Sequence, residues 1–376
     1  MNFIKILSLQ ELPEGTSKIV KIKNVKIAVF HFDGKITALG NACLHKGGPL
    51  GLGCVEKKYD GVYVTCPWHG WEYNVATGSA PPGYSDQQSL YEVQIDGEDI
   101  LISEEPIVKA KKAFHPDEKI SDLINLEYQT TPTSLNILGI STTNMNDELS
   151  RFSTSESALE NSLKYAQEKH GAATKMIKLR ELNFRHCEGY YSQHMNACTW
   201  PCSITEMNAE DGMTQVYREM VLWADVVLLA TPIRWGNASS LYYKMAERLN
   251  TVQNQITISN KVLIKNKVAS FIITGGQDNI QAVAGQLMCF FTDLGFSFPP
   301  FSFLGWSRGW TAEDMDKNVM QFKKSEYIKR TTEEIVDNCI ETLTNVKHID
   351  AKKIKAPKPH KQDSLSANLE NPDMNV

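Results

Sequence analysis

The chain has 376 residues, of which 42% are hydrophobic and 22% charged, and its formal net charge is −5. This length is enough for two domains, and the acidic excess argues against nucleic acid or an anionic membrane as the main partner. No apolar run approaches the length that crosses a bilayer, and the N-terminus does not read as a signal peptide, so we expect a cytoplasmic protein. Its eight cysteines are then expected to bind metal or act chemically rather than form disulfides.

The first 105 residues predict a small all-β domain. Apolar and polar residues alternate through "KIVKIKNVKIAVFHFDGKITAL" (18–39), which contains the turn signal Asp33-Gly34. "DGVYVTCP" (60–67) and "YEVQIDGEDILIS" (91–103) continue the pattern, the latter around a second Asp-Gly signal. Residues 106–133 mix charges, prolines and threonines, which predicts a linker with one helical turn near 118–126.

The period of the apolar residues changes from residue 134 onward. Buried-strand runs alternate with helical spacing over 134–347, which predicts a flavodoxin-like α/β domain with a five-stranded, parallel, doubly wound sheet. The expected strands are 134–140, 174–182, 224–232, 267–276 and 296–306. The expected helices are 156–169, with Thr154 or Ser155 as N-cap, then 213–223, 238–256 and 279–294. Residues 348–376 are Lys- and Pro-rich and then polar, so we expect a disordered tail.

Two short motifs each offer one thiol and one imidazole. Cys43-x-His45 lies in "CLHKGGPL", and Cys66-x-x-His69 lies in "CPWHGWEYNVATG". A structural zinc site usually takes two thiolates from one loop and its other two ligands from a second, whereas here each loop is mixed. The mixture suits two sulfide-bridged irons, one held by the two thiolates and the other by the two imidazoles. A zinc ribbon or two unrelated buried pairs is the alternative.

Residues 1–105 resemble a Rieske ferredoxin, or the Rieske domain of an oxygenase, through these two motifs. The resemblance implies a [2Fe–2S] cluster with Cys43, His45, Cys66 and His69 as its ligands. Rieske proteins of membrane complexes carry an additional, disulfide-bonded Cys in each cluster loop, which this chain lacks. The resemblance is therefore to the soluble, lower-potential type. Cys54 is expected to be a small core or surface residue.

A hydroxyl-rich loop follows the first predicted strand of the second domain. Serines and threonines surround a helix start there: Ser141, Thr142, Thr143, Ser153, Thr154 and Ser155. Hydroxyls, backbone N–H groups and a helix dipole can hold a phosphate dianion without a Lys, and the alternative is an ordinary N-cap in a polar loop. No Gly-x-Gly-x-x-Gly follows the strand, so a dinucleotide site of Rossmann type is unsupported.

Residues 134–310 resemble the NADPH-dependent FMN reductases of flavodoxin fold, and more specifically the iron–sulfur flavoproteins. The motifs that carry the resemblance are "GIST", "ATPIRWGNAS" and "TGGQDN". The resemblance implies FMN as cofactor and NAD(P)H as electron donor. It assigns the FMN phosphate to Ser141, Thr143, Ser153 and Ser155, the ribityl chain and ring to Pro232, Ile233, Arg234, Trp235, Gly236 and Asn237, and the polar edge of the isoalloxazine to Thr274, Gly275, Gly276 and Gln277.

One residue departs from that family's pattern. Arg234 stands where an aromatic residue is usual. Because a guanidinium beside the flavin would stabilise its anionic reduced form, we expect Arg234 and the adjacent Trp235 to be the catalytic residues.

The iron–sulfur flavoproteins carry a compact four-cysteine [4Fe–4S] motif where this chain has residues 183–204. Three thiols, Cys187, Cys198 and Cys202, are one short of the usual four, and His186 or His194 would have to complete the set. Whether this region binds a second cluster or has lost its metal stays open. Cys289 and Cys339 lie within helical patterns and are expected in the core.

These sites together predict an NAD(P)H-dependent oxidoreductase. NAD(P)H delivers two electrons as hydride and a [2Fe–2S] centre accepts one, whereas a flavin does both, so we expect FMN to pass single electrons through the Rieske cluster to an unidentified acceptor. Two further hypotheses are a terminal FMN-dependent reductase of a quinone or nitro compound fed through the Rieske domain, and a redox sensor without turnover.

The same residues exclude one class of enzyme, and the family resemblance implies an oligomeric state. A Rieske oxygenase is excluded because the nine histidines offer no plausible spacing for a two-His, one-carboxylate iron site. The family resemblance implies a homo-oligomer, a dimer or tetramer, and we expect no nucleic-acid or membrane partner.

Overall fold

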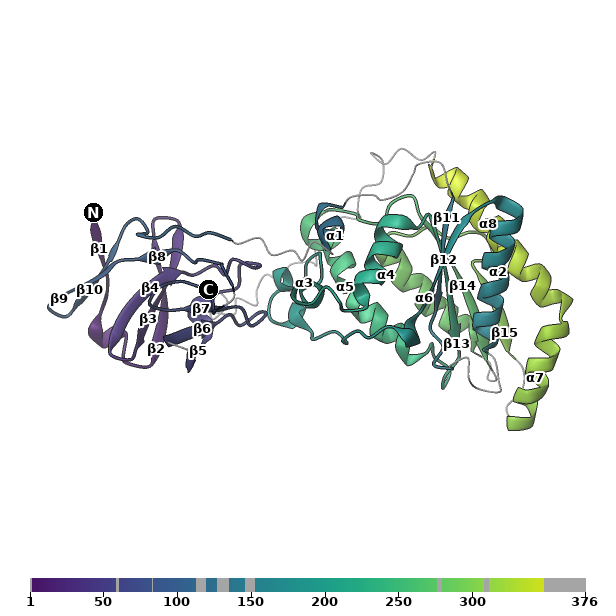
Figure 1. The fold of residues 1–376 in the computed structure, drawn as a ribbon, viewed down its shortest axis with the longest axis horizontal. Coiled ribbons are helices and arrows are strands. Elements are labelled where there is room, and N and C mark those ends of the chain that lie inside the picture. The colour runs from purple at the N-terminus through teal and green to yellow at the C-terminus, as the bar shows by residue number, and fades with distance from the viewer. Residues whose placement is uncertain are drawn as a thin grey trace, which may run out of the picture. The chain divides into compact units, whose positions relative to one another are not determined.

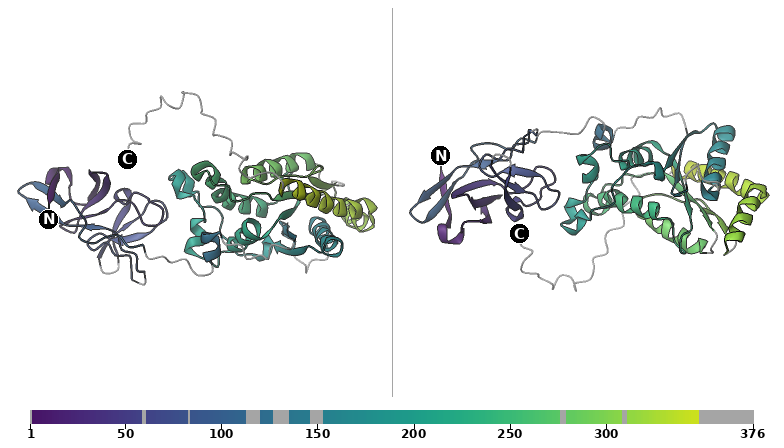
Figure 2. Two further views of the ribbon diagram at one scale, coloured as in Figure 1. Left: turned by 90° about the horizontal axis from the view of Figure 1, so that it is seen from above. Right: turned by 60° about the horizontal axis from the view of Figure 1, so that its bottom comes forward.

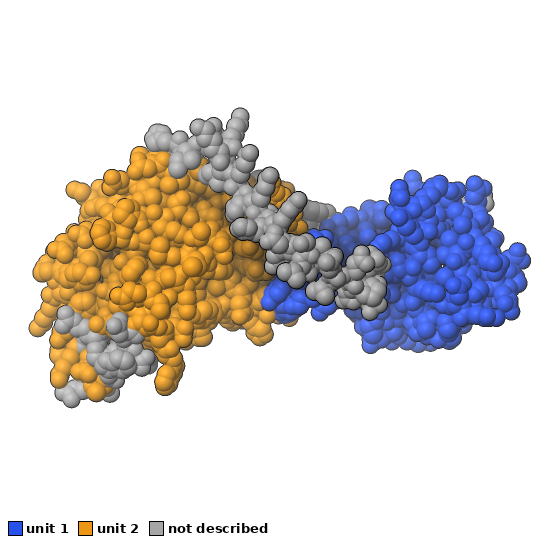
Figure 3. Space-filling view, turned by 180° about the vertical axis from the view of Figure 1, so that it is seen from behind, with its two compact units in different colours: residues 1–116, 188–198 blue, residues 117–187, 199–376 orange. Residues whose placement is uncertain are grey.

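The computed structural model describes residues 2–58, 61–82, 84–112, 120–126, 135–145, 153–275, 279–307 and 311–347. The chain divides into two compact units, coloured separately in Figure 3: residues 1–116 with 188–198 (unit 1), and residues 117–187 with 199–376 (unit 2). The tail predicted over 348–376 and two predicted flavin-site residues, Gly276 and Gln277, lie outside the described residues. In the part of the chain that is described, no helix is both long and apolar enough to cross a bilayer.

Unit 1 is built of three small antiparallel sheets (Figure 1). The first has the order β1 (Phe3–Ser8), β10 (Asp99–Ser103), β9 (Val93–Asp96). The second has the order β2 (Thr16–Ile22), β3 (Val25–Phe32), β4 (Lys35–Gly40), β8 (Leu90–Tyr91). The third has the order β5 (Cys54–Lys58), β6 (Gly61–Thr65), β7 (Glu72–Asn74). The all-β prediction for this region is confirmed.

The two predicted hairpin turns form as two-residue turns. Asp33 and Gly34 join β3 to β4 with φ angles of 55° and 68°, the left-handed pair that a type I′ turn requires. Gly97, with φ 61°, begins the turn between β9 and β10. The domain boundary at residue 105 stays a prediction, and the residues just beyond it are paired, since Val108 bridges to Leu90 and Lys111 to Gln87.

Unit 2 contains a five-stranded parallel sheet. Its strands lie in the order β12 (Ala173–Lys178), β11 (Asn136–Ser141), β13 (Val226–Pro232), β14 (Val268–Gly275), β15 (Phe303–Ser307). In chain order this is 2-1-3-4-5, the flavodoxin-like arrangement, so the predicted fold class is confirmed. The last strand is shorter than the predicted 296–306, because Pro299 and Pro300 have no N–H to donate to a ladder.

Helices cover both faces of this sheet (Figures 1 and 2). α2 (Thr154–His170) packs on β13 and β14, and α8 (Glu326–Lys347) packs on α2 and β14. α6 (Ile280–Leu294) lies against β14 and β15, with α5 (Ser240–Ser259) beside it. The shorter helices are α1 (Ser121–Asn125), α3 (Ser203–Met207), α4 (Met213–Tyr217), which continues as a π-helical stretch (Arg218–Trp223), and α7 (Ala312–Lys324).

The N-cap of α2 differs from the prediction. Ser153, not Thr154 or Ser155, has the extended backbone of a cap (φ −78°, ψ 118°), and its Oγ accepts a hydrogen bond from the N–H of Glu156. Thr154 and Ser155 already lie in the first turn. The spacing Ser-x-x-Glu at 153–156 was the sequence signal that favoured the earlier start.

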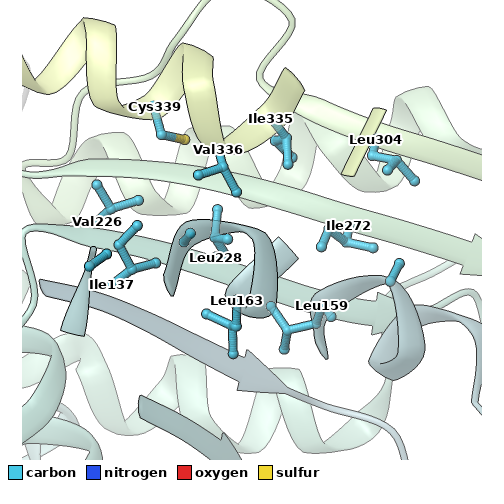
Figure 4. Close-up of a cluster of buried hydrophobic side chains, with 14 of the residues drawn as sticks. Ile137, Leu159, Leu163, Val226, Leu228, Ile272, Leu304, Ile335, Val336 and Cys339 are labelled. Carbon is cyan, nitrogen blue, oxygen red and sulfur yellow. The ribbon is translucent and has the colours of Figure 1, made fainter. Parts of the chain in front are cut away.

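The sequence pattern did not predict α7 or α8. α8 is amphipathic and closes the main core of unit 2 (Figure 4), where its apolar row faces the strands and α2. The labelled side chains come from the sheet (Ile137, Val226, Leu228, Ile272, Leu304), from α2 (Leu159, Leu163) and from α8 (Ile335, Val336, Cys339). Each such buried aliphatic side chain contributes about 1.5–3 kcal/mol.

The two cysteines predicted to lie in the core have different positions. Cys339 is buried, as predicted, whereas Cys289 is exposed on α6. α6 buries the row Val283, Leu287, Phe291 and Leu294, spaced three or four residues apart, and Cys289 lies off this row.

A buried ion pair attaches the segment before α4 to α5. The side chains of Arg248 and Asp211 are 0% and 1% exposed, and their charged groups lie 3.0 Å apart. Arg248 also donates to the carbonyl of Arg185 (2.7 Å) and to Oγ1 of Thr205 (3.0 Å). One fixed side chain therefore holds three points of the segment 185–211.

Replacing Asp211→Asn should destabilise the protein by about 3–5 kcal/mol, because it leaves the Arg248 charge buried without its carboxylate. Urea denaturation followed by circular dichroism measures the change. Glu168→Gln is the control, since it breaks the exposed Lys164–Glu168 pair and should cost no more than about 0.5 kcal/mol. Equal midpoints for the two variants would contradict the prediction.

Candidate functional site

The two Cys/His motifs of unit 1 form the same backbone turn. One lies between β4 and β5, the other between β6 and β7. The carbonyl of Cys43 accepts from the N–H of Gly47 (2.8 Å), and that of Cys66 accepts from the N–H of Gly70 (3.0 Å). Both glycines have left-handed φ angles, 84° and 77°. The last residue of each turn must be left-handed, which explains why glycine occupies positions 47 and 70.

The four candidate ligands converge in two chemically distinct pairs. The Nδ1 atoms of His45 and His69 lie 3.1 Å apart. The thiols of Cys43 and Cys66 are hydrogen-bonded to each other. Among the described residues, no group of three or more His, Cys, Asp or Glu side chains is placed to hold one metal ion. Two sulfur donors in one pair and two nitrogen donors in the other fit two metals better than a single zinc.

The sulfur atoms lie among N–H donors and close-packed atoms. The hydrogen bond from Cys43, and then the N–H groups of Trp68 and His69, lower the pKa of Cys66 to about 7 against the effect of burial. The same thiol–thiol bond and burial raise the pKa of Cys43. The hydroxyl of Tyr73 lies 3.9 Å from Sγ of Cys43, and burial raises the pKa of this phenol. Such donors favour a thiolate and tune a bound metal centre.

Aromatic side chains enclose the ligand pairs. The indole of Trp71 stacks on the imidazole of His45 with ring centroids 4.2 Å apart and planes 13° apart. Trp68, Tyr73 and the two cysteines belong to one buried apolar cluster. An apolar shell of this kind limits the access of water to a metal site and lowers the local dielectric.

The hydroxyl-rich loop and two further loops meet at the carboxyl ends of β11, β13 and β14 in unit 2. Oγ of Ser239, the N-cap of α5, donates to the carbonyl of Thr142 (2.6 Å). The hydroxyls of Thr154 and Thr274 are 2.7 Å apart, and the N–H of Ile233 donates to the carbonyl of Thr274 (2.8 Å). Parallel strands bring their carboxyl ends to one edge of the sheet, which is the edge where open α/β sheets bind ligands.

The residues predicted to hold the FMN phosphate lie at this edge, with hydroxyls bonded within the chain. Ser141 is fully buried and donates to the carboxylate of Glu156 (2.5 Å), and Oγ1 of Thr143 accepts from the N–H of Met145 (3.3 Å). Ser153 caps α2, and its Oγ lies 3.1 Å from that of Ser155. Their role as phosphate ligands stays a prediction.

Sequence reasoning missed Glu156, which lies at the centre of a charged network. Its carboxylate binds Arg180 through two bonds (2.5 and 2.9 Å) and Lys178 (3.1 Å). Burial raises its pKa, but Arg180, Ser141 and Lys178 together outweigh burial and hold the pKa below its usual value. No signal within residues 153–156 could have identified the partners, because both cations come from the end of β12 and the residues after it.

The loop after β13 presents an exposed tryptophan. Arg234 and Asn237 exchange two backbone hydrogen bonds (2.8 and 2.9 Å), which makes Trp235 and Gly236 the tip of a tight turn. Trp235 is 90% exposed with φ 50°, and Arg234 is exposed beside it. Pro232 and Ile233 are buried at the base of the turn.

The loop after β14 is attached to this turn. Nδ2 of Asn279 donates to the carbonyl of Gly236 (2.5 Å). Gly275 follows Thr274, and a Cβ there would approach Ile233 to 2.8 Å. The predicted ring-binding residues within the described range therefore lie together, and an aromatic side chain of high exposure beside a polar loop is suited to stacking on a flat ring.

The three cysteines at 187–202 are divided between the two units: Cys198 belongs to unit 1, and Cys187 and Cys202 belong to unit 2. Cys202 is buried in unit 2, whereas Cys187 and Cys198 are partly exposed, and no three candidate ligands converge among the described residues. Cys54 is exposed on β5, one of the two positions expected for it.

Comparisons with known proteins identify both halves of the chain. Residues 2–101 match the family "Rieske [2Fe-2S] domain", and residues 136–311 match the family "NADPH-dependent FMN reductase". The chain is 30% identical over 101 residues to the ferredoxin component of the naphthalene 1,2-dioxygenase system of Pseudomonas aeruginosa, which covers 27% of this chain and 93% of that protein. The chain therefore belongs to the Rieske [2Fe–2S] family through its N-terminal region, followed by an FMN reductase domain.

Two further similarities concern one curated protein and one solved structure. The chain is 30% identical over 88 residues to the 8-demethyl-8-aminoriboflavin-5'-phosphate synthase of Streptomyces davaonensis, which covers 23% of this chain and spans 34% of that protein's length. A crystal structure of RosB with bound 8-demethyl-8-formylriboflavin-5'-phosphate is 20% identical with a TM-score of 0.46, covering 57% of this chain and 81% of that one.

The two families define the chemistry of the protein. It is an oxidoreductase with a Rieske-type [2Fe–2S] cluster, FMN and NAD(P)H as its cofactors. The separate sulfur and nitrogen pairs of unit 1 fit the cluster, and the three joined loops of unit 2, with an exposed Trp235 at their edge, fit a flavin. Which residues bind each group is a proposal, on which the following two predictions depend.

Replacing Gly48→Ala should reduce the iron content, because the added Cβ would lie 2.6 Å from Sγ of Cys66 and 3.0 Å from Cγ of Trp68. Overpacking of this kind destabilises a protein by about 1–3 kcal/mol. At this position it would displace Sγ of Cys66. Iron per chain and visible absorption measure the loss. Gly285→Ala on α6, where no atom lies within 4 Å, is the control and should keep full iron. Full iron content in both variants would contradict the prediction that a side chain at position 48 displaces the sulfur of Cys66.

Replacing His69→Cys should retain iron but lower the reduction potential by on the order of 100 mV, because a thiolate replaces a neutral ligand. A redox titration followed by EPR measures it. The exposed His186→Cys serves as the control and should leave the potential unchanged. If His69→Cys left both the spectrum and the potential unaltered, His69 would not be a ligand.

Proposed function

We propose that this protein is an NAD(P)H-dependent electron-transfer enzyme. FMN accepts a hydride from NAD(P)H and passes its two electrons, one at a time, through the Rieske cluster to an acceptor. The observation that carries the proposal is the presence in one chain of a two-electron and a one-electron site, each with a residue set suited to its group.

The residues of unit 1 would bind and tune the cluster. Cys43 and Cys66 would hold one iron, and His45 and His69 the other, each imidazole through its inward Nδ1. The N–H groups around Sγ of Cys66 would stabilise negative charge on the sulfur and raise the potential.

The residues of unit 2 would bind and orient the flavin. Trp235 would cover a face of the ring, and Arg234 would place a permanent positive charge beside it. The hydroxyls of Ser153 and Thr154 lie at the start of α2, whose dipole favours a phosphate there. Ser141 would have to exchange its bond to Glu156 to reach a phosphate, so we rank it below Ser153 among the proposed ligands.

A second candidate function follows from the flavin-modifying relative. The name of the Streptomyces davaonensis protein says that it synthesises 8-demethyl-8-aminoriboflavin-5'-phosphate, a flavin phosphate as product. In this chain the flavin would then be the substrate. Mass spectrometry of the flavin released after turnover separates the two candidate functions. A flavin cofactor keeps its mass, whereas a flavin substrate is released with a changed mass.

Anaerobically purified protein should contain about two irons, about two sulfides and one FMN per chain, with a Rieske EPR signal after dithionite reduction. It should oxidise NADH or NADPH in the presence of an artificial acceptor. Cys66→Ser should keep NAD(P)H-dependent reduction of the flavin and lose one-electron transfer to a ferric acceptor.

Cys54→Ser is the matched control, because this thiol is exposed and outside the cluster loops. It should behave as the wild type. If Cys66→Ser still reduced an organic acceptor at the wild-type rate, the protein would be a terminal reductase. The absence of any NAD(P)H oxidation would leave the redox-sensor hypothesis.

A further inference from the structure

A segment from the second half of the sequence belongs to unit 1. Residues 188–198 are part of unit 1, although the residues on both sides of them in the chain belong to unit 2. The segment forms two short 3-10 turns, Tyr190–Ser192 and Met195–Ala197. The family resemblance concerned the cysteines and histidines of this region as possible ligands of a second cluster, and the proposed function gives the segment no role in unit 1.

A hydrogen bond joins this segment to one candidate cluster ligand. Nε2 of His69 lies 2.7 Å from the carbonyl oxygen of Ala197, 128 residues further along the chain, and the contact is buried. A carbonyl oxygen can only accept, so Nε2 of His69 carries the proton. Nδ1 of His69, which points toward His45, then has its lone pair available for a metal.

Two side chains of the segment make ring contacts with His69 and with its neighbour Trp68. Tyr190 meets His69 edge-on, with ring centroids 4.8 Å apart and planes 85° apart. His194 stacks on Trp68 at 4.7 Å and 13°. Ala197 is fully buried in the same apolar cluster as Cys43 and Cys66. His69 is 8% exposed.

We propose that residues 188–198 are an intramolecular cap on His69. The cap fixes the protonated nitrogen of this ligand through the carbonyl of Ala197, with Tyr190 and His194 as positioning residues. It also occupies the place from which an external redox protein would contact His69. An external redox protein therefore cannot exchange an electron through direct contact with His69. That exchange would transfer one electron without forming or breaking a bond.

The cap rests on the proposed function only for the identity of the group that His69 binds. Its geometry is a property of the chain, and its test needs no NAD(P)H. A failure of the proposed function, seen as absent NAD(P)H oxidation, is therefore distinguishable from a failure of the cap.

Modification of imidazole nitrogens by diethyl pyrocarbonate tests the cap in the full-length holoprotein. Peptide mass spectrometry should show His69 modified at least about tenfold more slowly than the exposed His186 in the wild type. The double variant Tyr190→Ala, His194→Ala should accelerate the modification of His69 about tenfold, because the ring contact on His69 and the one on the adjacent Trp68 are both lost.

Tyr191→Ala is the matched control, since this neighbouring tyrosine is 55% exposed, and it should leave the rate as in the wild type. Equal rates for His69 and His186 in the wild type would overturn the proposal, whether or not the double variant folds. A double variant no faster than Tyr191→Ala would also overturn it.

Electron transfer gives a second readout. The dithionite-reduced cluster should reduce ferric cytochrome c about tenfold faster in the double variant than in the wild type or in Tyr191→Ala, as followed by stopped flow. The EPR signal of the reduced cluster verifies that all three proteins carry it. Unchanged rates across the three proteins would show that the cap does not restrict access by a protein partner.

Discussion

The pairing of like donors in unit 1 is the constraint on which the candidate metal site depends. The loop between β4 and β5 and the loop between β6 and β7 form the same five-residue turn, which begins at a cysteine and is closed by a left-handed glycine. The imidazole follows two residues later in one loop and three residues later in the other. In the folded loops the two imidazole nitrogens lie close together, and so do the two sulfurs. A mononuclear site would need all four donors at one point, which this geometry does not provide.

The second site depends on a different physical principle. In a parallel sheet every strand ends at the same edge, so residues from three loops meet there without being near one another in the sequence. Hydrogen bonds such as Thr154–Thr274 and Asn279–Gly236 fix these loops to each other. The exposed Trp235 is held in a turn rather than packed, which is the reverse of what hydrophobicity alone favours for tryptophan. An aromatic surface kept available at such an edge is consistent with an FMN reductase domain.

The segment 183–211 contributes residues to both units. The buried pair Arg248–Asp211 fixes part of it within unit 2, through the carbonyl of Arg185 and Oγ1 of Thr205. Residues 188–198, by contrast, take part in the core of unit 1 beside His69. The segment 183–211 contains Cys187, Cys198 and Cys202. Its contacts with His69 and Trp68, however, come from the backbone carbonyl of Ala197 and from two aromatic rings.

The sequence by itself determined the fold class, the five strands of the parallel sheet, the hairpin turns and the two Cys/His motifs, because each depends on local spacing or on turn chemistry. It placed the start of α2 two residues late, missed α7 and α8, and put Cys289 in the core, since helix caps and burial depend on which face meets a neighbour. Only the tertiary structure decided that His69 bonds to Ala197 and that Glu156 binds Arg180. These partners are far apart in the chain, and local sequence patterns carry no information about contacts that form when distant segments pack together.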